Sequence, residues 1–329
     1  MLSRRPLTAV SVALLTALSL TACGGGADSS STPETSGNAT SVTIEDNNGT
    51  HTITTPPTSV VALDNRTFET LSQWDVQLAA AAVSLMPDTI PYKTDASIVD
   101  IGTHREPNLE AIVAVEPDLV INGQRFTQFQ DQLAELVPDA AIIDLDPRDG
   151  EPFDTELKRQ TTALGEIFGK QAEARQLNDD LDTAIARVKA AYNRDDTVMA
   201  VNTSGGELGY IAPHVGRTIG PLYDVLDLTP ALQVEGSDDH QGDDISVEAI
   251  AGSNPTWILV MDRDAAVAKS DPGYQPAADL LANSEALANV SAVQQGNIVI
   301  MPADTYTNEG IQTYTGFLNS FADALEAKK

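Results

Sequence analysis

Three arginine residues are the side chains of this sequence best suited to bind an anionic ligand: Arg125, Arg217 and Arg263. Cations are scarce, with 19 lysine and arginine residues against 48 aspartate and glutamate residues and a formal net charge of −29. A site for an anion must therefore gather its few cations locally. A guanidinium group offers a planar fork of donors that stays charged at any relevant pH. Three convergent arginines suit a compact polyanion, although each one alone could instead form an ordinary surface ion pair.

An internal repeat places two of these arginines at equivalent positions. Residues 108–125 read NLEAIVAVEPDLVINGQR and residues 246–263 read SVEAIAGSNPTWILVMDR. Both share Glu-Ala-Ile, then four residues, proline, seven residues and arginine. Each copy predicts a helix, a turn, a buried strand and an arginine at the carboxyl end of that strand, where parallel α/β sheets bind ligands. If the repeats belong to two facing lobes, Arg125 and Arg263 point into one cleft. Arg217 precedes a predicted helix in a glycine-bearing loop and is the third candidate.

The repeat also places Glu110 and Glu248 in the first turns of two predicted helices. An acid in that position complements the helix dipole, which is the simplest explanation. The alternative is a pair of symmetric exposed carboxylates, one on each lobe, that meet a partner with two-fold symmetry. The residues alone leave both interpretations open.

His240 and Tyr306 lie in two loops and carry side chains that can bind iron. Each could equally be a loop residue that forms hydrogen bonds. The sequence lacks the close His and carboxylate spacing of a dedicated zinc or manganese site. It also lacks a nucleophile elbow, a Walker loop and a cofactor fingerprint. We therefore expect a binding protein without an intrinsic cofactor, not an enzyme. The shortage of clustered cations argues against a nucleic-acid partner.

The N-terminus has the features of a lipoprotein signal. Arg4 and Arg5 precede an apolar run, residues 7–20, that is too short to span a bilayer comfortably. Leu20-Thr21-Ala22-Cys23-Gly24 then resembles a bacterial lipobox, and Cys23 is the sole cysteine of the chain. We expect residues 1–22 to be a signal peptide, with Cys23 as the lipidated mature N-terminus. The alternative is an ordinary secretory signal. Residues 23–41 are rich in Gly, Ser and Thr, which predicts a flexible tether.

The rest of the sequence predicts an α/β fold with two Rossmann-like lobes. Short apolar runs alternate with helical segments of about ten residues, which favours parallel sheets covered on both faces. We expect one lobe over residues 42–152 and the other over residues 194–329. The apolar period of residues 153–193 predicts a single long helix that joins them. Two helices with a break near Gly169 are the alternative. Gly165 and Gly169 are expected to mark a face where another element packs closely.

Four segments together resemble the iron-siderophore substrate-binding lipoproteins of ABC importers with a helical backbone. They are the lipobox, PNLEAIVAVEPDLVING, LGEIFGK and VMDRDA, and the resemblance extends over nearly all of the mature chain. Within that class, it is greatest to proteins that bind catecholate siderophores. The resemblance implies an extracytoplasmic protein, anchored to the membrane by a lipid, that delivers a ferric siderophore to a permease and its ATPase. We expect a monomer.

The resemblance also implies roles for individual residues. Arg125, Arg217 and Arg263 would bind the chelate. Gln124 is a further candidate, because relatives read Ser-Gly-Arg where this chain reads Asn122-Gly123-Gln124-Arg125. His240 and Tyr306 would bind iron only if the siderophore leaves coordination positions open, and Glu110 and Glu248 would dock on the permease. One alternative is the same fold carrying haem, cobalamin or another iron chelate. A lesser one is a lipid-anchored hydrolase, for which Ser204-Gly205-Gly206 makes a poor elbow.

Overall fold

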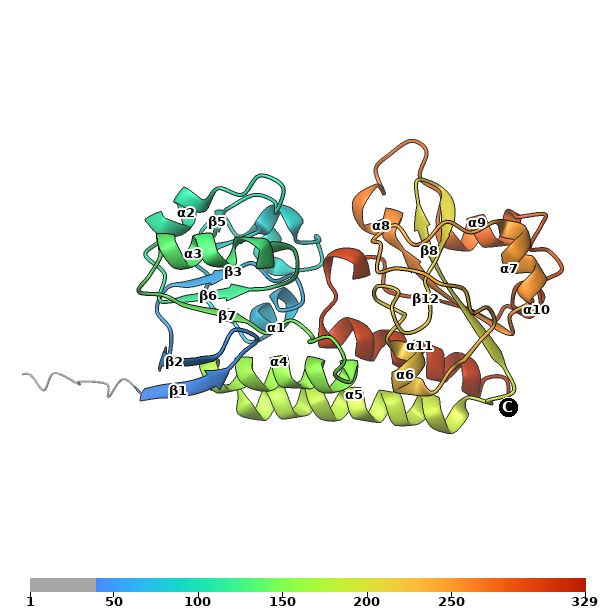
Figure 1. Ribbon diagram of the computed structural model, residues 1–329, viewed down its shortest axis with the longest axis horizontal. Helices are drawn as coiled ribbons and strands as arrows, with labels where there is room; N and C mark the ends of the chain where they lie inside the picture. The colour runs from blue at the N-terminus through green and yellow to red at the C-terminus, as the bar shows by residue number, and fades with distance from the viewer. Residues whose placement is uncertain (1–39) are drawn as a thin grey trace, which may run out of the picture. The chain divides into compact units, whose positions relative to one another are not determined.

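The computed structural model describes residues 40–329 (Figure 1). The expected signal peptide and Cys23 lie outside the described residues. The first strand begins at Thr40, so the last two residues of the expected tether belong to it. Within residues 40–329, no helix has the length and apolar character needed to cross a bilayer.

The N-terminal lobe, residues 40–152, contains an antiparallel hairpin of β1 and β2 and a parallel sheet of five strands in the order β5-β4-β3-β6-β7. Strand β6 reads Leu-Val-Ile-Asn and is buried throughout, as expected of a parallel strand covered on both faces. The elements are β1 (Thr40–Glu45), β2 (Thr50–Thr55), β3 (Val60–Ala62), α1 (Phe68–Gln73), β4 (Ala80–Ala81), η1 (Val83–Leu85), η2 (Pro91–Thr94), β5 (Val99–Asp100), α2 (Leu109–Ala114), β6 (Leu119–Asn122), η3 (Gln124–Phe129), α3 (Gln130–Leu136) and β7 (Ala141–Asp144).

The C-terminal lobe, residues 194–329, has a second five-stranded sheet. Strands β10, β8, β11 and β12 are parallel in that order, and β9 pairs antiparallel with β8. Strand β11 is buried over its whole length. The elements are β8 (Thr197–Ser204), β9 (Glu207–Tyr210), α6 (Leu222–Leu226), β10 (Thr229–Pro230), α7 (Val247–Ser253), β11 (Trp257–Asp262), α8 (Arg263–Val267), α9 (Ala277–Asn283), α10 (Ser291–Gln295), β12 (Ile298–Ile300), η4 (Thr305–Thr307) and α11 (Ile311–Glu326).

The two lobes are joined by a pair of helices, so the prediction of one long helix over residues 153–193 is wrong. Helix α4 (Phe153–Phe168) ends at Gly169, whose φ of +66° is left-handed, and α5 (Gln171–Ala191) then runs back along it. Glycine reaches that conformation without strain, which is why helices commonly end there. The apolar period continues through both helices, and a period alone cannot reveal the reversal. The alternative of a break near Gly169 is confirmed.

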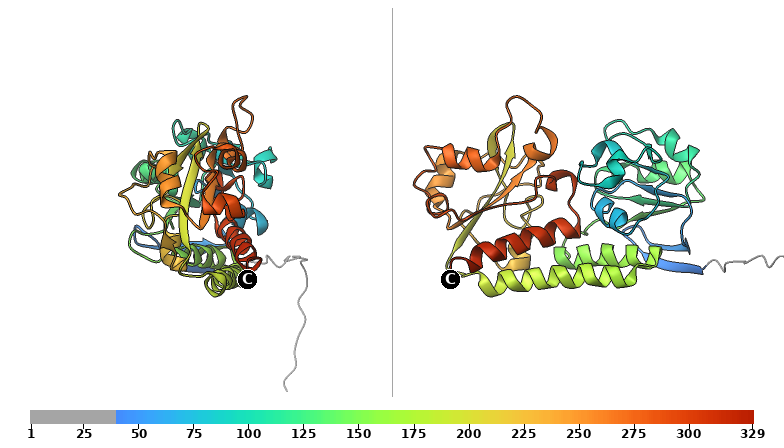
Figure 2. Two further views of the ribbon diagram at one scale, coloured as in Figure 1. Left: turned by 90° about the vertical axis from the view of Figure 1, so that its right-hand side faces the viewer. Right: turned by 180° about the vertical axis from the view of Figure 1, so that it is seen from behind.

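The antiparallel contact of α4 and α5 depends on Gly165. A Cβ added there would lie 2.6 Å from the Cβ of Ala174, so a side chain would push the helices apart. The expected close packing is therefore confirmed for Gly165, whereas Gly169 ends the helix. Lys158 Nζ donates to Asp182 Oδ1 at 2.6 Å across the same pair. Figures 1 and 2 show α4 and α5 side by side, with α11 alongside α5.

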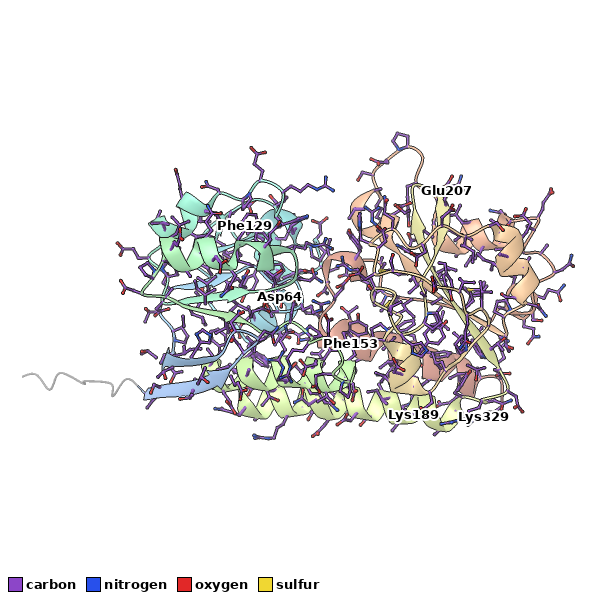
Figure 3. The ribbon with its side chains drawn as sticks, in the orientation of Figure 1. Asp64, Phe129, Phe153, Lys189, Glu207 and Lys329 are labelled. Carbon is purple, nitrogen blue, oxygen red and sulfur yellow. The ribbon has the colours of Figure 1, made fainter. Side chains whose placement is uncertain are left out.

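The helix pair completes the cores of both lobes. Leu164 and Ala174 are buried in the N-terminal core, and Leu181 and Val188 are buried in the C-terminal core. Leu177 packs against both cores. Phe153, labelled in Figure 3, begins α4 and lies edge-on to Tyr314 of α11, with ring centroids 4.9 Å apart. The connection is thus part of the packing of each lobe.

A second set of contacts joins the lobes between α1 and the start of α11. Asn308 Nδ2 donates to Glu69 Oε2 at 2.7 Å, and the Gln312 side-chain amide donates to Thr70 Oγ1 at 3.0 Å. Gly310 is pressed against the backbone of Arg66, because a Cβ there would lie 2.7 Å from the Arg66 carbonyl oxygen. These contacts bring the strand ends of the two lobes together.

Candidate ligand-binding site between the lobes

The carboxyl ends of parallel strands from both sheets supply the side chains of the site. Arg125 follows β6 by three residues, and Arg263 follows β11 directly. Tyr306 lies in η4, after β12. The loops beyond the carboxyl ends of strands are where open α/β sheets bind ligands. The repeat therefore brings its two arginines to corresponding ends of two different sheets.

Three guanidinium groups surround the ring of Tyr306. The Cζ atoms of Arg125 and Arg263 each lie 4.8 Å from the ring centroid, and that of Arg217 lies 5.3 Å from it. Arg125 also donates from Nη2 to the Tyr306 carbonyl oxygen at 3.0 Å. We call these four residues the arginine cluster. Its members come from both lobes, and the negative faces of the ring attract the cations that would otherwise repel one another.

The arginines of the cluster lower the pKa of the Tyr306 phenol. Tyr306 is buried, and burial by itself would raise the pKa of its phenol. The charge of Arg125, hydrogen bonding by Arg125 and Arg263, and the charge of Arg217 outweigh burial and lower the pKa below its usual value. The same charges would stabilise any other anion placed beside the ring.

A tight loop between β9 and α6 positions Arg217. Gly216 and Gly220 have no room for a side chain, since a Cβ at Gly220 would lie 2.1 Å from the Gly216 carbonyl oxygen. His214 and Thr218 both adopt positive φ, at +73° and +70°. The coiled backbone between Ala212 and Gly220 thus fixes the direction in which the Arg217 side chain leaves the loop.

Glu309, two residues before α11, is a fully buried carboxylate that binds Arg217 of the cluster. Its Oε1 accepts from Nε and Nη2 of Arg217, at 3.1 and 3.0 Å, and from Thr218 Oγ1 at 3.2 Å. Its Oε2 accepts from the side-chain amide of Gln124 and lies 3.4 Å from Nη2 of Arg66. Burial would raise the pKa of Glu309, but Arg217 and Arg66 outweigh it and lower the pKa.

Gln124 belongs to this buried polar network. Its backbone N–H donates to Asp146, which follows β7, and its side chain donates to Glu309. Asp146 Oδ1 in turn accepts from Nη1 of Arg66 at 2.8 Å. Gln124 therefore connects the strand ends of the N-terminal lobe to α11, beneath the arginine cluster.

Arg263 has its own neighbours in the C-terminal lobe. Its Nη1 donates to Ser204 Oγ at 3.2 Å and lies 3.5 Å from Oδ1 of Asp264. Only 16% of the Arg263 side chain is exposed. Ser204, considered above as a weak candidate nucleophile, is thus a hydrogen-bond partner of an arginine in the cluster.

Two histidines lie near the cluster, one from each lobe. The ring centroid of His240 is 6.5 Å from that of Tyr306, so the structure brings together these two candidate iron ligands. His104 has a buried Nδ1 without a hydrogen-bond partner and packs edge-on against Phe126. Burial and the charge of Arg125 lower the pKa of His104, while burial and Arg263 lower the pKa of His240 despite Asp239. A neutral imidazole keeps a nitrogen lone pair for hydrogen bonding or for a metal.

Glu110 and Glu248 lie apart from the cluster, each exposed in the first turn of its helix, α2 or α7. The two helices are capped alike, since Asn108 accepts from the backbone N–H of Ala111 and Ser246 accepts from that of Ala249. The internal repeat thus extends to the capping geometry. Both carboxylates are available to a partner.

A cavity of about 1070 Å³ opens beside the cluster and reaches the connecting helices. Arg125, Arg217, Arg66 and Gln124 line it, together with residues 146–154 and Lys189. Tyr306, Arg263 and His240 do not line it, so the cavity reaches the cluster from the side of Arg125 and Arg217. Across residues 40–329, no group of three or more His, Cys, Asp or Glu side chains is placed to hold a metal ion.

Sequence reasoning missed Arg66, Asp146, Glu309 and His104. Arg66 and Asp146 follow β3 and β7, so the rule that identified Arg125 would also have found them had it been applied to every strand. Asp64, labelled in Figure 3, follows β3 too and accepts from the side-chain amide of Gln160 at 2.9 Å. Glu309 gave no signal, because one buried carboxylate cannot be distinguished in a chain with 48 acidic residues.

Comparison with known proteins agrees with this architecture. The petrobactin-binding protein YclQ of Bacillus subtilis is 24% identical over 321 residues, which cover 96% of this chain and 97% of that protein. Its crystal structure superimposes with a TM-score of 0.74 over 87% of this chain and 99% of that chain. The ferric-anguibactin-binding protein FatB of Vibrio anguillarum is 29% identical over 270 residues, which cover 81% of each chain.

A third relative has been solved with ligand. The siderophore-binding protein BauB, bound to two molecules of acinetobactin and ferric iron, is 26% identical with a TM-score of 0.74, over 87% of this chain and 99% of that one. The sequence profile of the periplasmic binding proteins matches residues 60–305, well over half of the chain. The two sheets, the helical connection and the strand-end loops lie within or directly beside that match. The chain therefore belongs to the periplasmic binding protein family, whose members are binding proteins and not enzymes.

Proposed function

We propose that the protein captures a ferric siderophore between its lobes and delivers it to an ABC permease. The observation that carries the proposal is the arginine cluster, in which three guanidinium groups from both lobes meet at the ring of Tyr306. Siderophores bind Fe³⁺ through anionic oxygens, which accept charge-assisted hydrogen bonds from guanidinium groups. Such bonds are shorter and stronger than those between neutral groups.

The relatives support an iron chelate over other anions. The names of YclQ and FatB refer to petrobactin and ferric anguibactin, and BauB was solved with acinetobactin and ferric iron. In our proposal Arg125, Arg217 and Arg263 bind the chelate, and Gln124 holds the loop that carries Arg125. His240 and Tyr306 approach the iron where the siderophore leaves coordination positions open, and a catecholate siderophore is the preferred class.

Delivery requires a partner and a position outside the cytoplasm. Homologous binding proteins are periplasmic or extracytoplasmic, and the lipobox at Cys23 would anchor this one to the membrane surface. Glu110 and Glu248, one on each lobe, would meet matching cations of the permease, whose ATPase drives uptake. The protein would act as a monomer, since the two carboxylates already provide a two-fold pattern.

A binding panel tests the proposal. Trp74 and Trp257 are buried in the N- and C-terminal cores, and their fluorescence is the readout of the titration. The panel contains ferric complexes of a tris-catecholate, a bis-catecholate and a tris-hydroxamate, with haem, cobalamin and ferric citrate as competitors. We expect saturable quenching by a ferric catecholate at micromolar concentration or below, and a visible absorption band that co-elutes with the protein. Binding of haem or cobalamin but of no ferric siderophore would overturn the proposal.

A further inference from the structure

The positive charge of the arginine cluster is largely neutralised by carboxylates of the same lobe. Arg217 lies 3.0 Å from Oε1 of Glu309, and Arg263 lies 3.5 Å from Oδ1 of Asp264. The Glu309 side chain is fully buried and that of Asp264 is 7% exposed, so water screens neither pair strongly. Two of the three cations that face the ligand therefore already have a counter-charge.

A fourth guanidinium group, that of Arg66 in the N-terminal lobe, is also paired with carboxylates. Arg66 pairs with Asp146 at 2.8 Å and with Glu309 at 3.4 Å. Among the described residues, no carboxylate lies within ion-pairing distance of Arg125. Four guanidinium groups thus face three carboxylates, which leaves about one unit of positive charge, centred on Arg125. The adjoining cavity is balanced too, with five Lys and Arg side chains against six carboxylates in its lining.

This balance disfavours a ligand of high charge. The attraction between a site and an ion grows in proportion to the charge of the ion, whereas the cost of removing the ion from water grows with the square of that charge. One residual positive charge attracts a monoanion or dianion at a moderate desolvation cost. A trianion loses far more hydration and also approaches a chain of net charge −29.

Building on the function proposed above, we infer that the site selects ferric chelates of low net negative charge and that Glu309 sets this selectivity. Within residues 40–329, Glu309 is the one carboxylate that forms ion pairs with two of the four arginines, one in each lobe. Removal of its charge would add positive charge directly beneath the cluster. The added attraction would favour a trianion over a dianion, because it is proportional to ligand charge.

The test uses two complexes of one shape and different charge. A hexadentate tris-catecholate forms a trianion with Fe³⁺ and a dianion with Ge⁴⁺, and the ligand shell is the same in both. Isothermal titration gives both dissociation constants for the wild-type protein and for Glu309→Gln. We expect the wild-type protein to bind the Ge⁴⁺ complex about fivefold more tightly. In Glu309→Gln, we expect the preference to shift toward the Fe³⁺ complex by about tenfold.

Glu156→Gln is the matched control. Glu156 is also fully buried and also accepts hydrogen bonds from two arginines, Arg148 and Arg159, but it contacts no member of the cluster. We expect its ratio of dissociation constants to stay much closer to that of the wild type than the ratio of Glu309→Gln, because Arg148, which it leaves without a partner in the cavity lining, is not a member of the cluster. An equal shift in both variants would refute the assignment to Glu309, because the effect would then come from overall charge.

The outcomes separate this inference from the proposed function. If the wild-type protein binds both complexes and prefers the trianion, the charge selectivity is refuted while siderophore capture stands. If it binds neither complex nor any other ferric siderophore of the panel, the proposed function itself fails. Should Glu309→Gln not fold, the wild-type ratio still tests the charge selectivity of the site, which a preference for the dianion supports and a preference for the trianion refutes.

Discussion

Arg66 of the N-terminal lobe and Glu309 of the C-terminal lobe form a buried ion pair, with 3.4 Å between Nη2 and Oε2. Glu309 also binds Arg217, so one carboxylate holds cations from both lobes. Removal of one partner from a buried ion network leaves the others without a counter-charge, which commonly costs about 3–5 kcal/mol. We therefore expect Glu309→Ala to lower the free energy of unfolding by that amount in urea. A loss below about 1 kcal/mol would show that the pair does not hold the lobes together.

Arg217 and Arg263 can be tested by truncation. Arg217→Ala and Arg263→Ala each remove charge-assisted donors from the cluster, and we expect each to weaken ferric-catecholate binding at least about tenfold. Fluorescence titration measures the loss, and thermal unfolding shows that the variants remain folded. Arg187→Ala is the matched control, because its guanidinium binds Asp323 and Glu326 at the surface. Unchanged affinity in both cluster variants would refute the site.

Tyr306 can be tested with two substitutions that separate its ring from its hydroxyl. Tyr306→Phe keeps a ring for the three guanidinium groups, and we expect affinity for a hexadentate chelate within about threefold of wild type. Tyr306→Ala removes the three cation–π contacts, each worth about 0.5–1 kcal/mol, and we expect about tenfold weaker binding. For a tetradentate chelate, a changed visible band in Tyr306→Phe would indicate a phenolate–iron bond. Equal affinity of the Ala and wild-type proteins would mean that the ring does not organise the cluster.

Asp64 should make stability depend on pH in an unusual direction for an acid. Burial, with the neighbouring charge of Asp146, raises the pKa of Asp64 from 3.8 to about 8. Because the folded state favours the protonated carboxyl, this contribution to stability is complete below about pH 4 and is lost as pH rises toward 8. We expect Asp64→Asn to flatten the decline between pH 5 and 9 by about 4 kcal/mol. Chemical denaturation across that range measures it, and identical pH profiles would contradict the expectation.

Replacement of glycine by alanine is expected to have opposite effects at a packed position, Gly165 in α4, and at an open position, Gly316 in α11. Alanine at Gly165 would lie against Ala174, so we expect Gly165→Ala to lower the free energy of unfolding by about 1–3 kcal/mol. Gly316 lies in α11 with no atom within 4 Å of an added Cβ, so Gly316→Ala should raise it by up to about 1 kcal/mol. Two changes of the same sign would show that helix propensity, not packing, decides at Gly165.

The sequence predicted most strands of both sheets because their apolar runs are short, buried and separated by turns. It missed the two-residue edge strands β5 and β10, which have no apolar run of their own. It also predicted Arg125 and Arg263, since a strand and its following residue keep a fixed relationship in parallel sheets. It could not reveal the reversal at Gly169, because two antiparallel helices keep the same apolar period as one long helix. Glu309 and His104 were beyond reach for another reason. Their neighbours, Arg66 and Phe126, come from other elements, and only the packed fold determines those contacts.

Leu177 lies in the first half of α5 and packs against the cores of both lobes. Each lobe has its own sheet, but both lobes pack their apolar cores against the same helix, α5. A cut anywhere near this residue would strip apolar cover from both halves at once. We therefore expect that neither half keeps its own structure when the two are separated.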